Sequence, residues 1–310
     1  MDLLLIQYVL AVPMKSAKTI VLFVATLTMA GSAIAQTWTP TGAPVNNWVS
    51  VASSADGTRL AAGAGPVAVF TSTNSGVTWT SHSVADAYFF HSIVSSADGM
   101  KLMTLGANNS SPGMAVYTST NAGVNWVSNN IPNRYLIAIA SSADGNKLVA
   151  AVGVWPGVIP YLATNGPIFI STNSGVTWQQ SAAPSEIWSC LASSADGTTL
   201  AAGTMTDKSQ NFPLGAGPLY VSTNAGATWV PTVALTNTWS SIACSADGTK
   251  MIAAGRSIYT STDSGVTWIS NNLPSSAWAS VASSADGSKL VAVSEFGLIY
   301  TSTNSGVTWM

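Results

Sequence analysis

Short apolar runs alternate with short polar turns from about residue 45 to the end of the chain, and this order recurs six times. In the last unit, the apolar runs are 278–282, 289–293, 298–301 and 307–309. Each run has a length typical of a strand and is too short for an average helix. The pattern therefore predicts units of four short strands, with helix content near zero outside residues 1–35.

The turn after the first run of each unit is nearly invariant. It reads Ser-Ser-Ala-Asp-Gly at 53–57, 95–99, 141–145, 193–197 and 283–287, and Cys-Ser-Ala-Asp-Gly at 244–248. Asp-Gly between two apolar runs favours a hairpin, because glycine accepts a positive φ at little cost. Successive Asp residues of this turn are 42, 46, 52, 51 and 39 positions apart.

A second turn, of the form Ser-Thr-Asn/Asp-x-Gly-x-x-Trp, also recurs six times, at 72–79, 119–126, 171–178, 222–229, 261–268 and 302–309. Its Ser and Asn side chains can bond the turn backbone, its Gly takes a left-handed conformation, and its Trp covers the hairpin. Four-stranded units of this length, repeated around an axis, are typical of a β-propeller. We predict an all-β, six-bladed β-propeller of four-stranded antiparallel blades over residues 36–310. A seven-bladed propeller with an incomplete blade is the alternative.

This second turn resembles the Asp box, S-x-D-x-G-x-T-W, of the bacterial neuraminidase (BNR) repeat family. The whole chain resembles sialidase-like and photosystem II assembly-factor-like bacterial propellers. The resemblance implies that the box lies between the third and fourth strands and has a structural role. The chain departs from the family pattern, because only Asp263 keeps the acid. The predicted structural positions of the six boxes are Asn74, Gly76, Trp79, Asn121, Gly123, Trp126, Asn173, Gly175, Trp178, Asn224, Gly226, Trp229, Asp263, Gly265, Trp268, Asn304, Gly306 and Trp309.

The first 35 residues have the features of a secretory signal peptide. Lys15 and Lys18 precede an uncharged apolar run at 19–29, and Ala-Ile-Ala stands at 33–35. The run is shorter than the roughly 20 residues of a membrane span. We predict cleavage after Ala35, a natural start at Met14 with residues 1–13 as an extension, and a secreted or periplasmic protein.

Composition narrows the function. Charged residues make up 7% of the chain, hydrophobic residues 47%, and the net charge is −2. Disorder and nucleic-acid binding are therefore excluded. The two cysteines, Cys190 and Cys244, cannot make a zinc site or a disulfide framework, and their offset along adjacent innermost strands predicts two buried thiols. We expect no cofactor, no metal, no stable membrane insertion and a monomer.

Alternating strand direction predicts that both recurrent turns lie on one face of the disc, named here the bottom face. Loops between second and third strands, and crossings between blades, then lie on the opposite top face. Only these loops vary in length, with insertions at 108–114, 153–167 and 204–218. Because loops on a rigid scaffold carry function, we predict a binding wall on the top face for a protein or carbohydrate partner. Its aromatic and polar candidates are Trp155, Tyr161, Asn165, Asp207, Lys208 and Asn211.

Weaker candidates also map to top-face loops and crossings: Asp86, Arg134, Glu186, Arg256 and Glu295, together with His82 and His91. Four tryptophans precede a turn Asp by eight residues: Trp48, Trp188, Trp239 and Trp278. They can pack between blades or serve as stacking platforms for a ligand. The segment Thr37-Trp38-Thr39 resembles the end of a fourth strand, and we expect it to close the ring beside the last blade.

The enzyme interpretation is tested by the arginines. A sialidase uses three of them on the substrate carboxylate, whereas this chain has only Arg59, Arg134 and Arg256, and Arg59 occupies a repeated hairpin position. The family's Arg-Ile-Pro signature is missing. We predict a secreted, non-catalytic binding or scaffold propeller. The alternative is a glycoside hydrolase, sialidase-like in fold, with paired carboxylates drawn from Glu186, Asp207 and Glu295.

Overall fold

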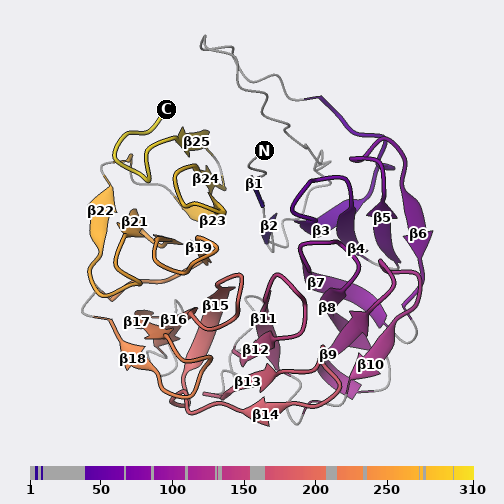
Figure 1. Cartoon of the computed structure of the whole chain (residues 1–310), viewed down its shortest axis with the longest axis horizontal. Helices are drawn as coiled ribbons and strands as arrows, with labels where there is room; N and C mark the ends of the chain where they lie inside the picture. The colour runs from indigo at the N-terminus through magenta and orange to yellow at the C-terminus, as the bar shows by residue number, and fades with distance from the viewer. Residues whose placement is uncertain are drawn as a thin grey trace.

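A computed structural model of the chain describes residues 4–5, 8–9, 39–65, 68–84, 87–108, 111–129, 131, 135–153, 165–206, 215–232, 236–271, 273–274, 277–295 and 297–310. These residues form six β-sheets arranged around a central axis (Figure 1). The predicted six-bladed β-propeller is thereby confirmed, and the described residues contain no helix. Consequently, no described helix could span a membrane.

Each blade runs from an innermost strand at the axis to an outermost strand at the rim, with every neighbouring pair antiparallel. In chain order the strands of the blades are β3 (Asn47–Ser53), β4 (Leu60–Gly65), β5 (Ala68–Ser72) and β6 (Thr80–His82); β7 (Ala87–Ser95), β8 (Leu102–Asn108), β9 (Ser111–Ser119) and β10 (Val127–Asn129); β11 (Leu136–Ser141), β12 (Leu148–Val152), β13 (Ile168–Ser171) and β14 (Gln179–Gln180); β15 (Ile187–Ser193), β16 (Leu200–Thr206), β17 (Gly215–Ser222) and β18 (Val230–Pro231); β19 (Ser241–Cys244), β20 (Met251–Ala254), β21 (Ile258–Ser261) and β22 (Ile269–Asn271); and β23 (Trp278–Ser284), β24 (Leu290–Ser294) and β25 (Ile299–Ser302).

The outermost strand of a blade begins later in the chain than the sequence predicts. The predicted fourth strand of the sixth blade, 307–309, belongs to the turn instead. The reason is the box tryptophan, whose indole N–H donates back to the carbonyl of the box glycine, as in Trp309 to Gly306 at 3.0 Å. The strand position therefore starts after the tryptophan, where Met310 exchanges two backbone hydrogen bonds with Thr301, at 2.9 Å each.

Two short strands at the axis, β1 (Leu4–Leu5) and β2 (Tyr8–Val9), lie inside the ring of blades (Figure 1). β1 pairs antiparallel with β23, and β2 pairs antiparallel with β3. The predicted ring-closing segment is described only from Thr39 onward. Trp38 lies outside the described residues, so that closure stays a prediction.

Both recurrent turns lie on one face, as predicted. In the first blade, the backbone N–H of Ser75 in the box donates to the carbonyl of Thr58, directly after the Asp-Gly turn, at 2.9 Å. The corresponding bond is present in each of the other five blades. Contact between the two turns within every blade defines the bottom face.

A chain of backbone hydrogen bonds joins the Asp-Gly turns around the axis. In five successive pairs, the alanine of one turn donates its N–H to the carbonyl of the alanine in the next, at 2.6–2.8 Å: Ala55, Ala97, Ala143, Ala195, Ala246 and Ala285. A cation after the turn also bridges to the next blade, as Lys147 does to the Asp196 carbonyl at 2.7 Å. Its stem occupies the space that a Cβ on Gly197 would need, so only glycine fits there.

Blades pack against each other through apolar side chains. One core cluster combines Ile137, Val149 and Ala151 of the third blade with Trp188 and Leu200 of the fourth. All four tryptophans of the innermost strands are at most 5% exposed. Trp188 meets Tyr220 edge to face, with ring centroids 5.4 Å apart. These tryptophans are therefore packing residues and not ligand platforms.

Candidate functional site

The top-face candidates are only partly covered by the structure. Of the predicted binding wall, Asn165 is described; Trp155, Tyr161, Asp207, Lys208 and Asn211 lie outside the described residues. Of the weaker candidates, Glu186, Arg256 and Glu295 are described, whereas Asp86 and Arg134 are not. The described residues show how the base of each long loop, called its foot below, is bonded to the neighbouring blade.

The long loop of the third blade is anchored to the fourth blade. Gly166, beside exposed Asn165, pairs with Glu186 through two backbone hydrogen bonds of 2.9 and 3.3 Å. The buried indole of Trp188 donates to the Gly166 carbonyl at 2.8 Å. A Cβ at Gly166 would overlap Val152, so the close approach requires glycine. The structure thus places Glu186 opposite Gly166, the residue that follows the predicted candidate Asn165.

The long loop of the fourth blade has the same kind of foot. Gly217 exchanges two backbone hydrogen bonds with Asn237, at 2.9 and 3.0 Å, and accepts a third from the indole of Trp239 at 2.8 Å. The β16–β17 hairpin continues beyond this point, and its last pair is Thr206 with Gly215. Gly166 and Gly217, which follow loops 154–164 and 207–214, are thus each bonded to the next blade.

Glu186 has a local structural partner. The hydroxyl of Tyr220 donates to its Oε1 at 3.3 Å. Burial, followed by the nearby Glu186 carboxylate, raises the pKa of Tyr220. In the next blade Asn237 occupies the position of Glu186, two residues before the tryptophan, and its Nδ2 donates to the hydroxyl of Tyr259 at 3.5 Å. The two contacts occupy equivalent places in consecutive blades, with the tyrosine hydroxyl donating in the first and accepting in the second.

The other described charges stand apart. Arg256 is exposed on the short turn between β20 and β21, and its backbone N–H donates to Asn237 Oδ1 at 3.1 Å. Glu295 is exposed in the sixth blade, and its N–H donates to the Ala277 carbonyl at 2.8 Å. Within the described part of the chain, no three His, Cys, Asp or Glu side chains gather as a metal site would require.

The placement of the two histidines in top-face loops is wrong. His91 lies in β7, is 3% exposed, and has its pKa lowered to about 4 by burial. His82 lies in the outermost strand β6, where its Nε2 is 2.8 Å from Thr71 Oγ1. His91 lies within the innermost strand, and His82 ends the outermost strand, which begins only after the box tryptophan.

The box turns explain the change from Asp to Asn. In the third blade, Asn173 Oδ1 accepts from the Thr177 N–H at 2.9 Å, and its Nδ2 donates to the Thr177 hydroxyl at 2.9 Å. In the fifth blade, Asp263 accepts both bonds, from the Thr267 N–H at 2.8 Å and its hydroxyl at 2.6 Å. The threonine hydroxyl reverses its role, so either residue closes the turn.

Sequence reasoning missed one feature of the box. The residue before the box glycine is also left-handed, with φ of 55–58° at Ser75, Ala122, Ser174, Ala225, Ser264 and Ser305. Non-glycine residues rarely adopt this conformation. Because the sequence contains Ser or Ala there, which carry no special turn signal, the pattern did not predict it.

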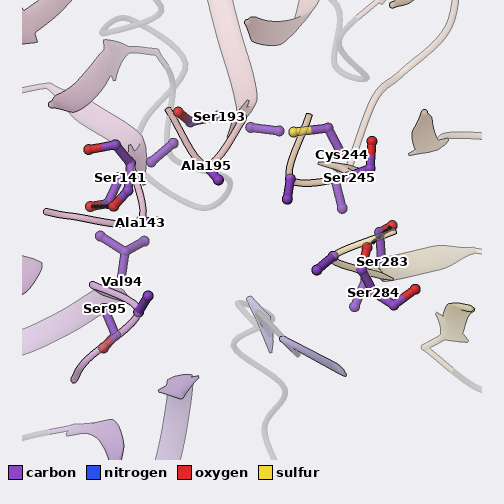
Figure 2. A pocket seen from close by; sticks show the side chains of 18 of the residues that line it. Val94, Ser95, Ser141, Ala143, Ser193, Ala195, Cys244, Ser245, Ser283 and Ser284 are labelled. Carbon is purple, nitrogen blue, oxygen red and sulfur yellow. Dashed lines mark hydrogen bonds between the residues drawn. The ribbon is translucent and has the colours of Figure 1, made fainter. Parts of the chain in front are cut away.

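An axial cavity of about 160 Å³ lies at the bottom end of the central channel (Figure 2). Side chains of all six blades surround it, among them Ser95, Ala143, Ala195, Cys244 and Ser283, and none of its lining residues is charged. Both cysteines are free thiols, as predicted, although Cys244 is half-buried rather than buried. Burial, then the carboxylate of Asp247, raises the pKa of Cys244 to about 12.

No protein-family model matches the sequence, and no curated protein is similar to it in sequence. Solved structures share the fold at low identity. A GH74 xyloglucanase from Xanthomonas campestris has a TM-score of 0.60 and 15% identity over 80% of this chain and 43% of the enzyme. YCF48 from Cyanidioschyzon merolae has 0.59 and 13%, over 84% and 83% of the two chains. YCF48 bound to D1 peptide has 0.58 and 13%, over 87% and 81%.

These comparisons define the class of protein as a β-propeller and show the fold alone. The chain spans 43% of the xyloglucanase and 36% of a second solved structure, an ancestral GH74 enzyme, which is less than half of either length. It spans about four fifths of YCF48. Solved structures with this fold therefore include both an enzyme and a protein bound to a peptide.

Proposed function

We propose that this chain is a secreted, non-catalytic propeller that binds a protein or glycan through the variable loops of its top face. Residues 1–35 act as its signal peptide. The binding wall consists of the loops between second and third strands of the second, third and fourth blades, with Trp155 and Tyr161 as aromatic anchors and Asn165, Asp207, Lys208 and Asn211 as a polar rim.

One observation carries the proposal. The feet of both long loops are bonded to the next blade, through the Gly166–Glu186 and Gly217–Asn237 pairs and the indoles of Trp188 and Trp239. Rigid feet reduce the conformational entropy that a loop loses on binding. Aromatic side chains add contact area with few rotamers to fix. The likeness to a peptide-bound propeller agrees with this function.

The glycoside hydrolase alternative requires a pair of carboxylates at a fixed separation. Its best described candidate, Glu186, contacts Tyr220 at the place where Asn237 contacts Tyr259 in the next blade. An amide in the equivalent position indicates that this place in the blade needs a polar partner and not an acid. We therefore favour binding over hydrolysis.

The test begins with a glycan array and a pull-down that identify a ligand for the full chain. Trp155→Ala should then weaken binding by about tenfold or more while the melting temperature stays unchanged. The matched control is Val176→Ala, an exposed bottom-face residue, which should leave affinity unchanged. Unchanged binding in Trp155→Ala, or hydrolysis of a bound glycan that Glu186→Gln abolishes, would overturn the proposal.

A further inference from the structure

The exposed apolar side chains of the described residues gather at the rim of the bottom face. Twelve large hydrophobic side chains of these residues are exposed, and nine of them lie in a box turn or directly after its tryptophan. Five follow the box glycine, with exposed fractions of 60–79%: Val77, Val124, Val176, Val266 and Val307. Four follow the tryptophan, where the outermost strand position begins: Val127, Val230, Ile269 and Met310. Single exposed apolar residues are ordinary on a protein surface, but a gathered group of them marks an interaction surface.

These nine side chains, named the apolar ring below, lie at one level of the disc. In every blade, the residue before the box glycine donates its N–H to the carbonyl of the residue after the Asp-Gly turn, at 2.8–2.9 Å. Because the six blades are arranged around one axis (Figure 1), these equivalent bonds place the six box turns at the same height along it. A flat partner surface can therefore contact several members of the ring at once.

The polar neighbours of the apolar ring can be covered at low cost. In the third box, Thr172, Asn173 and Thr177 are exposed and uncharged beside Val176, and the same positions of the other boxes are uncharged except at Asp263. The Asn173 Nδ2 already donates to the Thr177 hydroxyl at 2.9 Å. Because these groups bond each other, they lose less on leaving water than unpaired polar groups would.

Inside the apolar ring, charges of opposite sign alternate around the axis. The six aspartates of the Asp-Gly turns are exposed. Cations of one blade reach the turn of the next, as Arg59 does to the Asp98 carbonyl and Lys250 to the Asp286 carbonyl, both at 2.9 Å. A cation thus lies between successive carboxylates. When two such faces meet, the cations of one can stand opposite the carboxylates of the other, so the face is complementary to itself.

From these observations we propose that the bottom face binds the bottom face of a second copy of this chain. A two-fold axis in the plane of contact relates the two copies, as in most homodimers, so that each presents the same surface to the other. The two apolar rings meet around the edge, and the Asp-Gly turns meet inside it. Both top faces point outward, so this dimer does not rest on the function proposed for the top face. The dimer replaces the monomer that the sequence predicts.

Sedimentation equilibrium of the full chain tests the association. The wild type should show a reversible monomer–dimer equilibrium. A chain carrying Val77→Asp, Val176→Asp and Val266→Asp should raise the Kd by about tenfold or more, because like charges then meet across the contact. Val45→Asp with Leu298→Asp is the matched control, since these side chains are 84% and 69% exposed but lie outside the apolar ring. The control should leave the Kd unchanged. Threonine at the same three ring positions adds no charge, and should raise the Kd by about threefold where the aspartate chain does not fold.

A second experiment locates the contact, in a full chain with Cys190 and Cys244 replaced by serine. Because the blades repeat, the two faces can meet in more than one register. The reporter chain therefore carries three cysteines in alternate blades, Val77→Cys, Val176→Cys and Val266→Cys. A short bis-maleimide should link two copies of this chain. The matched control carries cysteine at three exposed residues of the opposite side, Asn165, Arg256 and Glu295, and should stay unlinked.

Three results would overturn the proposal: a wild type that stays monomeric up to about 1 mM, an equal rise of the Kd in the control chain, or cross-linking through the control cysteines. A monomeric wild type that binds phosphatidylcholine vesicles, and loses them in the aspartate chain, would assign the ring to a lipid surface instead. Trp155→Ala should leave the Kd of the dimer unchanged. Failure of top-face binding and failure of the dimer are therefore read in separate measurements.

Discussion

The two faces of the disc are built from the same strands but differ in how far their turns repeat. On the bottom face, the six Asp-Gly turns share one sequence and one set of bonds, with each serine hydroxyl on its aspartate at 2.5–2.6 Å. On the top face, the position two residues before the innermost-strand tryptophan is Glu186 in the fourth blade and Asn237 in the fifth.

The difference teaches where structure constrains the sequence. Each bottom turn bonds its own strands and also the turn of a neighbouring blade, so a change in one copy disturbs a neighbour. A top loop needs only a backbone contact with the next blade at its base, such as that of Gly166 or Gly217. Its remaining residues can differ between blades. Specific recognition therefore has more freedom to arise on the top face than on the bottom.

The largest effect should come from the tryptophans that hold the two faces. Trp188 is fully buried and anchors the top loops, so Trp188→Ala should lower the free energy of unfolding by about 3–5 kcal/mol. Trp178 of the bottom box is half-buried, and Trp178→Ala should cost less, about 1–2 kcal/mol. Urea unfolding measures both. A larger loss for Trp178 would reverse the order of importance assigned here.

Backbone conformation sets the next effect. Gly175 has φ of 88°, and a Cβ there would lie 2.9 Å from Thr118 Cγ2, so Gly175→Ala should cost about 1–3 kcal/mol. The residue before the box glycine gives a matched control, because there a change to glycine should raise the free energy of unfolding. Ala225 has φ of 55°, and Ala225→Gly should stabilise by about 0.5 kcal/mol, the difference between relieved strain and added chain entropy. Equal losses in the two variants would contradict the assignment.

Repetition explains which parts of the molecule were predictable. The Asp-Gly and box turns recur six times, so strand number, blade number and the shared face could all be predicted from the sequence. The pairing of Glu186 with Tyr220 could not, because residues 34 positions apart meet only through the packing of one blade. The interblade alanine bonds were hidden for a similar reason, since alanine carries no sequence signal for a backbone contact.

Acid should weaken the bottom face selectively. The serine hydroxyl of each turn, with the backbone N–H two residues after the aspartate, lowers the aspartate pKa, to about 2 at Asp56 and Asp196. A carboxylate with a depressed folded pKa stabilises the fold above its unfolded value near 3.9, and that stability is lost as pH falls toward about 2. The urea concentration at the unfolding midpoint should therefore decrease as the pH is lowered from about 4 to 2. Asp196→Asn should make this decrease smaller.

The buried His91 acts in a separate, higher window. Its folded pKa of about 4 lies below the unfolded value, so the unfolded chain takes up the proton first. Stability should decline as pH falls from about 6.5 to 4, before the bottom aspartates contribute. A single loss confined to the lower window would show that His91 is not buried in its neutral form.

The smallest effect should be at the one box that keeps its acid. Asp263→Asn converts the fifth box to the form of the other five, with the Thr267 hydroxyl accepting from the new amide instead of donating to the carboxylate. The number of bonds is unchanged, so the free energy of unfolding at neutral pH should change by less than about 0.5 kcal/mol. The Thr267 hydroxyl and N–H lower the pKa of Asp263, so the variant should also lose its share of the acid sensitivity. Urea unfolding at neutral and acidic pH measures both quantities.

Thr267→Val is the informative partner, because it removes the hydroxyl from either arrangement and should cost more than Asp263→Asn. A marked loss at neutral pH in Asp263→Asn alone would mean that this box requires its charge, and that the bottom turns are less uniform than their sequences indicate.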